Sequence, residues 1–403
     1  MLPGSLTPHA HECLVRLGTW IPSFEQARKE LAATLKVEVS KAMSRRQTEA
    51  AGAAYVEVQR QEVEQIEKEL PLSPAQPTKV QVSTDGVMVP LVGGEWAEVK
   101  TVIIGDIVAI KAGQNEVQTE NISYFSRKME AQHFNRLALS EMHRRGLENA
   151  QQIAAPADGA EWIQGFIDFH CPQAVRILDF AHAAERISDI GQAIFDQAET
   201  DGKKWLEQQL HQLKHEGPTK VLATLDQLQS EHPDLEILSD NLAYLQKRKA
   251  HMQYPTFQAQ GLPIGSGAVE SAHKVVVQPR LKGAGMHWTP DNVNPMVALR
   301  TLVCNDRWAE QWPKIALQLR QQATQRQRTL QQKRRALKQA QTQPSASARP
   351  QQPQTSAPPL SDQKTSPAPP KNRSPYRPPP NHPWRRSPIG RARFQSFNNS
   401  SKN

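Results

Sequence analysis

The chain has 403 residues and a net charge of +9, and 38% of its residues are hydrophobic. It contains no uninterrupted apolar span of about eighteen residues and no signal-peptide pattern at its start, which argues against membrane insertion and export. The three cysteines, Cys13, Cys171 and Cys304, lie far apart without a Cys-x-x-Cys pair, so neither a disulfide framework nor a structural zinc site is indicated. We therefore expect a soluble, cytoplasmic protein with one large core or two to three domains.

Residues 1–70 are predicted to be helical. In "PSFEQARKELAATL", Ser23 and Gln26 have the spacing of a capping box, and apolar residues follow at helical intervals. A second helix is expected to begin at Ser40. The short connection "KVEVS" is compatible with a helix-turn-helix DNA-binding region and equally with an ordinary helical hairpin. Three basic residues would be exposed early in the second helix: Lys41, Arg45 and Arg46.

The segment 79–110 is rich in Val, Ile and Thr and is predicted to form strands. Within it, "STDGVMVPL" contains Asp85, although aspartate is uncommon in strands. Asp85 and Gly86 are compatible with a tight hairpin turn, because glycine accepts the positive φ that such a turn requires. In the alternative interpretation Asp85 projects from a long strand, the turn lies at Gly93-Gly94, and the carboxylate serves chemistry.

The next elements alternate between helix and strand. Helical spacing in 127–146 and 159–170 alternates with the strand candidates "AQQIAAPAD" and "AVRILDF", an order typical of an α/β domain. Residues 183–258 are polar and Leu-rich and are predicted to form an all-helical insertion. The pattern changes again at Gly261, and further helices are expected to about residue 340.

The last part of the chain, residues 341–403, is dominated by Pro, Ser, Gln and Arg. This composition predicts a disordered tail, because too few apolar residues remain to form a core. From Gln321 onward there are sixteen Lys or Arg residues against one acid, Asp362, whereas the preceding 320 residues have a net charge of −6. The basic character belongs to the tail, which we expect to add sequence-independent affinity for DNA.

Three acidic residues are predicted to lie where strands end or helices begin, which is where functional groups gather in α/β sheets. They are Asp85, Asp158 after "QQIAAPA", and Glu270 in the helix that follows "IGSG". Taken singly, each has a structural interpretation: a turn for Asp85, a helix cap for Asp158, and a favourable charge at a helix start for Glu270. Taken together, they fit a different pattern.

Three segments carry this pattern: "VSTDGVMVPLVGGEWAEVK", "ADGAEWIQGFIDFHCPQAVRILDFAHAAERI" and "GLPIGSGAVESAHKVVVQPRLKGAGMHW". On these segments the chain resembles the DDE transposases of bacterial insertion sequences, and within them the Kra-type group related to Mutator-like transposases. The resemblance extends over roughly residues 5–310, with the segments in the same order and a helical insertion in the corresponding place.

The resemblance implies an RNase H-like catalytic core in two parts, residues 78–182 and 259–320, on either side of the insertion. It implies catalytic carboxylates from the first strand, the fourth strand and a late helix, here Asp85, Asp158 and Glu270. Converging carboxylates repel one another and need cations, and their oxygens suit two Mg²⁺ or Mn²⁺ ions better than zinc. Asp85 is therefore better interpreted as a metal ligand on a strand than as a turn residue.

The same resemblance implies roles for other residues. Asp179 and His182 in "DFAH" fit an accessory motif of Mutator-like enzymes, so Asp179 competes with Asp158 as second acid and His182 is expected to contact DNA. Beyond the catalytic helix, basic and aromatic residues are expected to bind phosphates or stack on an unpaired base: Arg280, Lys282 and Trp288. The structural alternatives are a solvated basic turn, a buried Trp and a structural His.

The expected function is DNA transposition, with element ends and target DNA as partners and a homo-oligomer assembled on DNA in the bacterial nucleoid. The chain lacks the Cys-rich segment that family members commonly carry before the part beginning here at "LPGSLTP", and the basic tail is not a shared feature. Two alternatives remain open: a truncated remnant that only binds DNA, and another RNase H-like nuclease.

Overall fold

The computed structural model describes residues 6–109, 117–195 and 200–342. The predicted disordered tail lies outside the described residues from position 343 onward. The chain divides into two units, Met1–Leu337 and Lys338–Asn403, and the strands of the described residues all belong to the first. No helix among the described residues is long and apolar enough to cross a membrane.

The predicted helical region at residues 1–70 contains three helices. They are α1 (Pro8–Trp20), α2 (Phe24–Leu35) and α3 (Lys41–Glu69). The Ser23 hydroxyl accepts a hydrogen bond from the Gln26 N–H at 3.2 Å, and the Ser40 hydroxyl accepts one from the Met43 N–H at 3.1 Å. These N-caps confirm both predicted helix starts.

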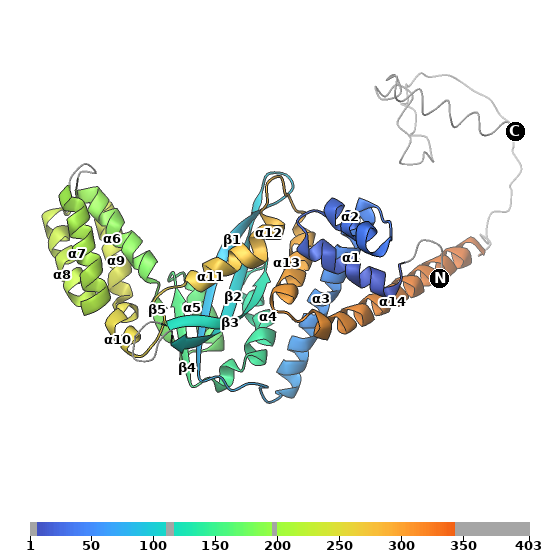
Figure 1. The fold of residues 1–403 in the computed structure, drawn as a ribbon, viewed down its shortest axis with the longest axis horizontal. Helices are drawn as coiled ribbons and strands as arrows, with labels where there is room; N and C mark the ends of the chain where they lie inside the picture. Colours follow the sequence, from blue (N-terminus) through green and yellow to red (C-terminus); the bar gives the residue numbers. More distant parts are fainter. Residues whose placement is uncertain (1–5, 110–116, 196–199, 343–403) are drawn as a thin grey trace, which may run out of the picture. The chain divides into compact units, whose positions relative to one another are not determined.

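A five-stranded mixed sheet in the order β3-β2-β1-β4-β5 lies at the centre of this unit (Figure 1). Its strands are β1 (Lys79–Pro90), β2 (Trp96–Ala109), β3 (Val117–Arg127), β4 (Gln152–Ala157) and β5 (Val175–Leu178). β2 pairs antiparallel with β1 and with β3, whereas β4 pairs parallel with β1 and with β5. The predicted mixed α/β class is thereby confirmed, and β3 is an additional strand that the sequence pattern did not indicate.

Helices fill the intervals between the strands and follow them. They are α4 (Ala131–Arg144), α5 (Glu161–His170), α6 (Phe180–Ile194), α7 (Thr200–Glu216), α8 (Pro218–Glu231), α9 (Glu236–Lys247), α10 (Tyr254–Ala259), α11 (Gly267–Ala272), α12 (Gln278–Leu281), α13 (Pro290–Cys304) and α14 (Trp308–Thr342). Short 3₁₀ turns lie at Leu147–Asn149 and Lys249–Met252, and a π-helical turn lies at His273–Val277. Within its described residues, the predicted insertion at 183–258 contains helices and no strand.

The two faces of the sheet carry different helices, because successive residues of a strand point to opposite sides. Val102 and Ile104 of β2 pack in one cluster with residues of α4 and α5. Ile103, between them, packs on the other face against α11. Asp85 pairs across the strands with Thr101, two residues from Ile103, so Asp85 belongs to the face that α11 covers.

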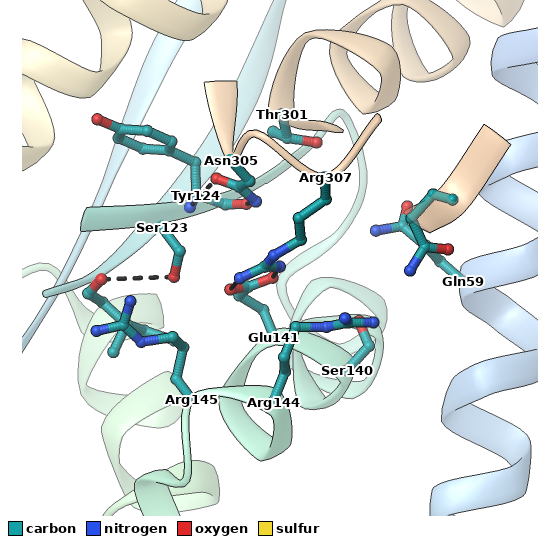
Figure 2. A network of polar contacts seen from close by, with 12 residues as sticks. Gln59, Ser123, Tyr124, Ser140, Glu141, Arg144, Arg145, Thr301, Asn305 and Arg307 are labelled. Atoms are coloured by element: carbon teal, nitrogen blue, oxygen red, sulfur yellow. Dashed lines mark hydrogen bonds and ion pairs between the residues drawn. The ribbon is translucent and has the colours of Figure 1, made fainter. Parts of the chain in front are cut away.

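A polar network joins the C-terminal helices to β3 and α4 (Figure 2). Asn305 accepts a hydrogen bond from the Tyr124 N–H at 2.9 Å and donates one to the Tyr124 carbonyl at 3.0 Å. Its amide thus pairs with the edge strand as a neighbouring strand would. Arg307 donates two hydrogen bonds, of 2.5 and 2.8 Å, to the buried carboxylate of Glu141. These contacts cover part of a sheet edge that would otherwise be open to pairing with another chain.

Candidate active site

Asp85 lies within β1, and the strand continues through Asp85 and Gly86, which both pair with β2. The chain reverses at Gly93 and Gly94, whose φ angles are +102° and +88°. The strand interpretation of Asp85 is therefore confirmed, and the hairpin interpretation is wrong. A carboxylate in this position needs an explanation other than turn formation.

Asp85 lies on β1, and Asp158 is the first residue beyond the end of the adjacent parallel strand β4. Gln81 of β1 is aligned with Ala154 of β4, and the pairing between the two strands ends there. Asp85 follows Gln81 by four residues, and Asp158 follows Ala154 by four, so both acids lie four residues along the chain beyond the last paired residues. Unpaired carboxyl ends of parallel strands are the usual place of functional sites in α/β sheets.

Glu270 approaches the same face of the sheet from α11. Val269 and Ala272 of this helix pack on Ile103, which fixes the helix over β2. Glu270 lies between these two buried residues in sequence and remains exposed. The helix therefore holds the carboxylate at the surface above the strand that carries Asp85.

The pKa of Asp85 shows that the acidic groups lie within electrostatic reach of one another. Burial is the largest cause that raises this pKa, to about 6, and the negative charges of Asp158 and Glu270 raise it further. The Gly86 N–H, which donates to Asp85 Oδ1 at 2.7 Å, and the charge of His182 oppose the rise. All three predicted catalytic acids thus contribute to one electrostatic site centred on Asp85.

The turn that carries Asp158 is held by α9 of the helical insertion. Tyr244 donates its hydroxyl to the Asp158 carbonyl, and Arg248 donates to the Gly159 carbonyl at 2.8 Å. Gly159 has a φ of +83°, and a Cβ there would lie 2.5 Å from Arg248 Nε, so only glycine suits the position. Asp158 Oδ1 accepts the Ala160 N–H at 2.8 Å, which stabilises the turn before α5 and leaves Oδ2 for another role. The helix-capping interpretation of Asp158 is wrong, because the N-cap of α5 is Ala160 and no side chain caps this helix.

Asp179, the competing second acid, is buried and bonded to the backbone through both oxygens. Its Oδ1 accepts the N–H groups of Ala181 at 2.6 Å and His182 at 3.3 Å, which caps α6. Its Oδ2 accepts the N–H of Ser266, in the loop that leads into α11. Asp179 therefore ties two segments of the fold together, and this geometry favours Asp158 as the second acid.

The helix that carries Glu270 changes to a π-helical turn at His273–Val277. Pro279 has no N–H, so the carbonyl of Val275, four residues earlier, lacks its helical partner. Arg300 of α13 replaces that partner, since its Nη2 donates to the Val275 carbonyl at 2.6 Å and its Nε donates to the next carbonyl at 3.1 Å. A buried arginine thus compensates the interruption and fixes the helix on α13.

His273 begins the π-helical turn and lies next to Asp85. Its Nδ1 is 3.5 Å from Asp85 Oδ2, and its side chain is only 6% exposed. Burial is the main cause that lowers the pKa of His273 to about 4, so the imidazole is neutral at pH 7. The sequence motifs did not single out His273, although it follows Glu270 by three residues, a spacing at which helical residues share a face.

The four predicted DNA contacts fall into two groups. Lys282 is exposed, and the side chain of His182 is 42% exposed. Arg280 and Trp288 are buried, with 2% and 7% exposure. The Arg280 guanidinium carbon lies 4.3 Å from the centre of the Phe24 ring and 5.1 Å from that of Trp288, so it joins α12 to the N-terminal helices. This packing corrects the expectation that Arg280 and Trp288 face DNA, and the structural interpretation of a buried Trp is the correct one.

The oxygen ligands that Asp85, Asp158 and Glu270 offer are of the kind that Mg²⁺ and Mn²⁺ prefer. Among residues 6–109, 117–195 and 200–342, no group of three or more His, Cys, Asp or Glu side chains is close enough together to hold a metal ion.

Comparisons of the chain with protein-family models and with curated proteins gave no match. Function is therefore argued from the arrangement of the acids and from the chemistry that this arrangement permits.

Proposed function

We propose that this chain is a DDE transposase with an RNase H-like catalytic core, which cleaves DNA and joins the freed strand to a target. The observation that supports this most directly is the approach of three carboxylates to one face of the sheet. They come from the first strand, the fourth strand and a late helix, as the resemblance to Kra-type transposases implies: Asp85, Asp158 and Glu270.

In the proposed mechanism these three residues would hold two Mg²⁺ or Mn²⁺ ions, which when bound would supply activation of the attacking oxygen and stabilisation of the leaving oxygen of a phosphodiester. Asp85 offers a carboxylate from a rigid strand, where burial and neighbouring negative charge make an added cation favourable. Asp158 keeps one oxygen on the Ala160 N–H and has the other available as a ligand. Glu270 is exposed on α11 and would provide the third carboxylate ligand.

The proposed partners are DNA of the element ends and of the target. We further propose that the chain acts as a homo-oligomer assembled on DNA in the bacterial nucleoid. The exposed early residues of α3 support a DNA-contacting role of the N-terminal helices: Lys41, Arg45 and Arg46.

Asp158→Asn and Glu270→Gln are expected to reduce metal-dependent DNA cleavage by about a thousandfold or more, because each removes a charged ligand from the reacting centre. The measurement uses DNA containing the sequences that flank the gene, with Mg²⁺ or Mn²⁺, and follows strand cleavage and joining. Glu207→Gln, an exposed acid on α7 of the insertion, is the matched control and should retain wild-type activity. Cleavage that persists in either site variant, or in EDTA, would contradict the proposed function.

Removing residues 343–403 is expected to weaken binding to all DNA sequences alike. This segment contains ten Lys or Arg residues spaced by Pro and Ser. For each phosphate that the shortened chain no longer neutralises, the slope of log affinity against log salt should become shallower by about 0.9 on duplex DNA. Titrations of random duplex DNA at several salt concentrations compare the full and shortened chains, and equal slopes would exclude this role for the tail.

A further inference from the structure

The end of the β1–β2 hairpin presents apolar side chains to solvent. Trp96 is 55% exposed, Met88 45% and Val92 59%. Trp96 pairs with Pro90 across the two strands, and Met88 lies two residues away from Pro90, on the same face. An exposed indole beside other exposed apolar groups is unusual enough to suggest a binding role.

This end of the hairpin is held firmly by the segment that follows α12 (Figure 1). The Trp288 N–H donates to the Pro90 carbonyl at 3.1 Å, and the Val92 N–H donates to the Trp288 carbonyl at 2.9 Å. Trp288 itself is buried against Leu91 and Phe24 in one cluster. The backbone beside Trp96 is therefore fixed, so its indole is presented from an ordered position.

A basic group accompanies the exposed indole. Lys282 Nζ lies 5.9 Å from the centre of the Trp96 ring. An aromatic surface next to a cation is the combination that binds unpaired nucleic acid, because the base stacks on the ring and the phosphate meets the charge. Glu95 is also exposed in the hairpin turn, and its negative charge opposes the attraction of a phosphate by Lys282.

The helical segment that ends beside Lys282 is polar and partly basic. It exposes Lys274 and Lys282, and Gln278 in part. Two positive charges therefore accompany the indole. A phosphate backbone complements this charge, whereas an acidic active site alone would repel it.

We propose that Trp96 and Lys282 form a stacking site for an unpaired DNA base. This inference rests on the proposed function, because it takes DNA as the ligand. It assigns to Trp96 the stacking role that the sequence motifs suggested for Trp288, whose ring is covered by packing.

The test compares forked DNA, which has a single-stranded arm, with a full duplex of the same length. Trp96→Ala is expected to weaken binding of forked DNA by about 5- to 100-fold, the range for loss of one base-stacking contact, and to leave duplex binding within about twofold. Trp96→Phe, which keeps an aromatic face, should retain most of the affinity. Phe169→Ala is the matched control, because Phe169 is an aromatic residue that is 59% exposed and lies elsewhere, on α5.

The outcomes separate this inference from the proposed function. If the wild-type chain cleaves and binds DNA but Trp96→Ala binds forked DNA as tightly as wild type, the stacking site is excluded and the proposed function stands. Equal weakening by Trp96→Ala and Phe169→Ala would also exclude the site. A change in the oligomeric state of Trp96→Ala without a change in forked-DNA binding would show a protein interface instead. A wild-type chain that binds no DNA overturns both.

Discussion

Asp85→Asn is expected to abolish DNA cleavage and at the same time to stabilise the folded protein. Asparagine keeps an oxygen that accepts the Gly86 N–H, but it carries no charge and is a poor metal ligand. Burial and the neighbouring acids raise the pKa of Asp85 from 3.8 to about 6, so the ionised carboxylate is unfavourable in the folded state. A shift of this size is equivalent to about 3 kcal/mol, and exposure of 36% of the side chain reduces the expected gain to about 1 kcal/mol.

The sign of the effect defines a pH window. Because the folded-state pKa of Asp85 is raised, protonated Asp85 favours folding, and this contribution is lost as the pH rises from about 4 to above 6. Asp85→Asn should therefore be more stable than wild type at pH 7 and show no such advantage at pH 4. Urea unfolding of both proteins at pH 4, 5, 6 and 7 measures the difference. A gain in the free energy of unfolding that is the same at every pH, or a loss of it at pH 7, would contradict the prediction. Either result would show that ionisation of Asp85 does not destabilise the folded protein.

Asp179→Ala is expected to destabilise the fold by about 2–4 kcal/mol, from loss of a helix cap and of an acceptor for a buried N–H. The cap is that of α6, and the buried N–H belongs to Ser266 in the loop before α11. Cleavage should fall as well, because that loop leads into the helix that carries Glu270. The loss of activity would then follow from structure and not from loss of a metal ligand.

Two measurements distinguish Asp179 from Asp158. Asp158→Ala should remove cleavage while lowering the free energy of unfolding by about 1 kcal/mol, since it loses only the Ala160 N–H as a partner. Asp179→Asn keeps an acceptor for the α6 cap and should recover part of the stability and of the activity. If Asp179→Ala unfolded like wild type and lost all cleavage, while Asp158→Ala still cleaved, the second acid would be Asp179.

The local sequence around Asp85 is compatible with a hairpin turn and with a continuous strand. Only residues elsewhere in the chain decide between the two. Asp-Gly favours a turn by itself, but β1 continues because residues on both sides of Asp85 pair with β2. β3 escaped prediction for a related reason. It is an edge strand whose first part consists mostly of polar residues that are exposed or partly exposed. It therefore lacks the apolar run that marked β1 and β2.

The residues that support the site were harder to predict than the acids themselves. A basic residue beside a Trp looks the same whether both are exposed or buried, and Arg280 is buried because Phe24, far away in the sequence, lies against it. Tyr244 and Arg248 lie in a polar helix in which nothing distinguishes them from their neighbours. Their roles depend on which turn packs against α9, and the local sequence does not specify that.

The hydrogen bonds from α9 to the Asp158–Gly159 turn mean that the two strand-borne acids depend on different parts of the chain. Asp85 is fixed by the sheet, whereas the turn after β4 is fixed by Tyr244 and Arg248 of the insertion. A ligand or a second copy that shifts α9 would therefore change the separation of the two carboxylates without touching either. If the proposed function is correct, the insertion therefore takes part in positioning the second acid through Tyr244 and Arg248.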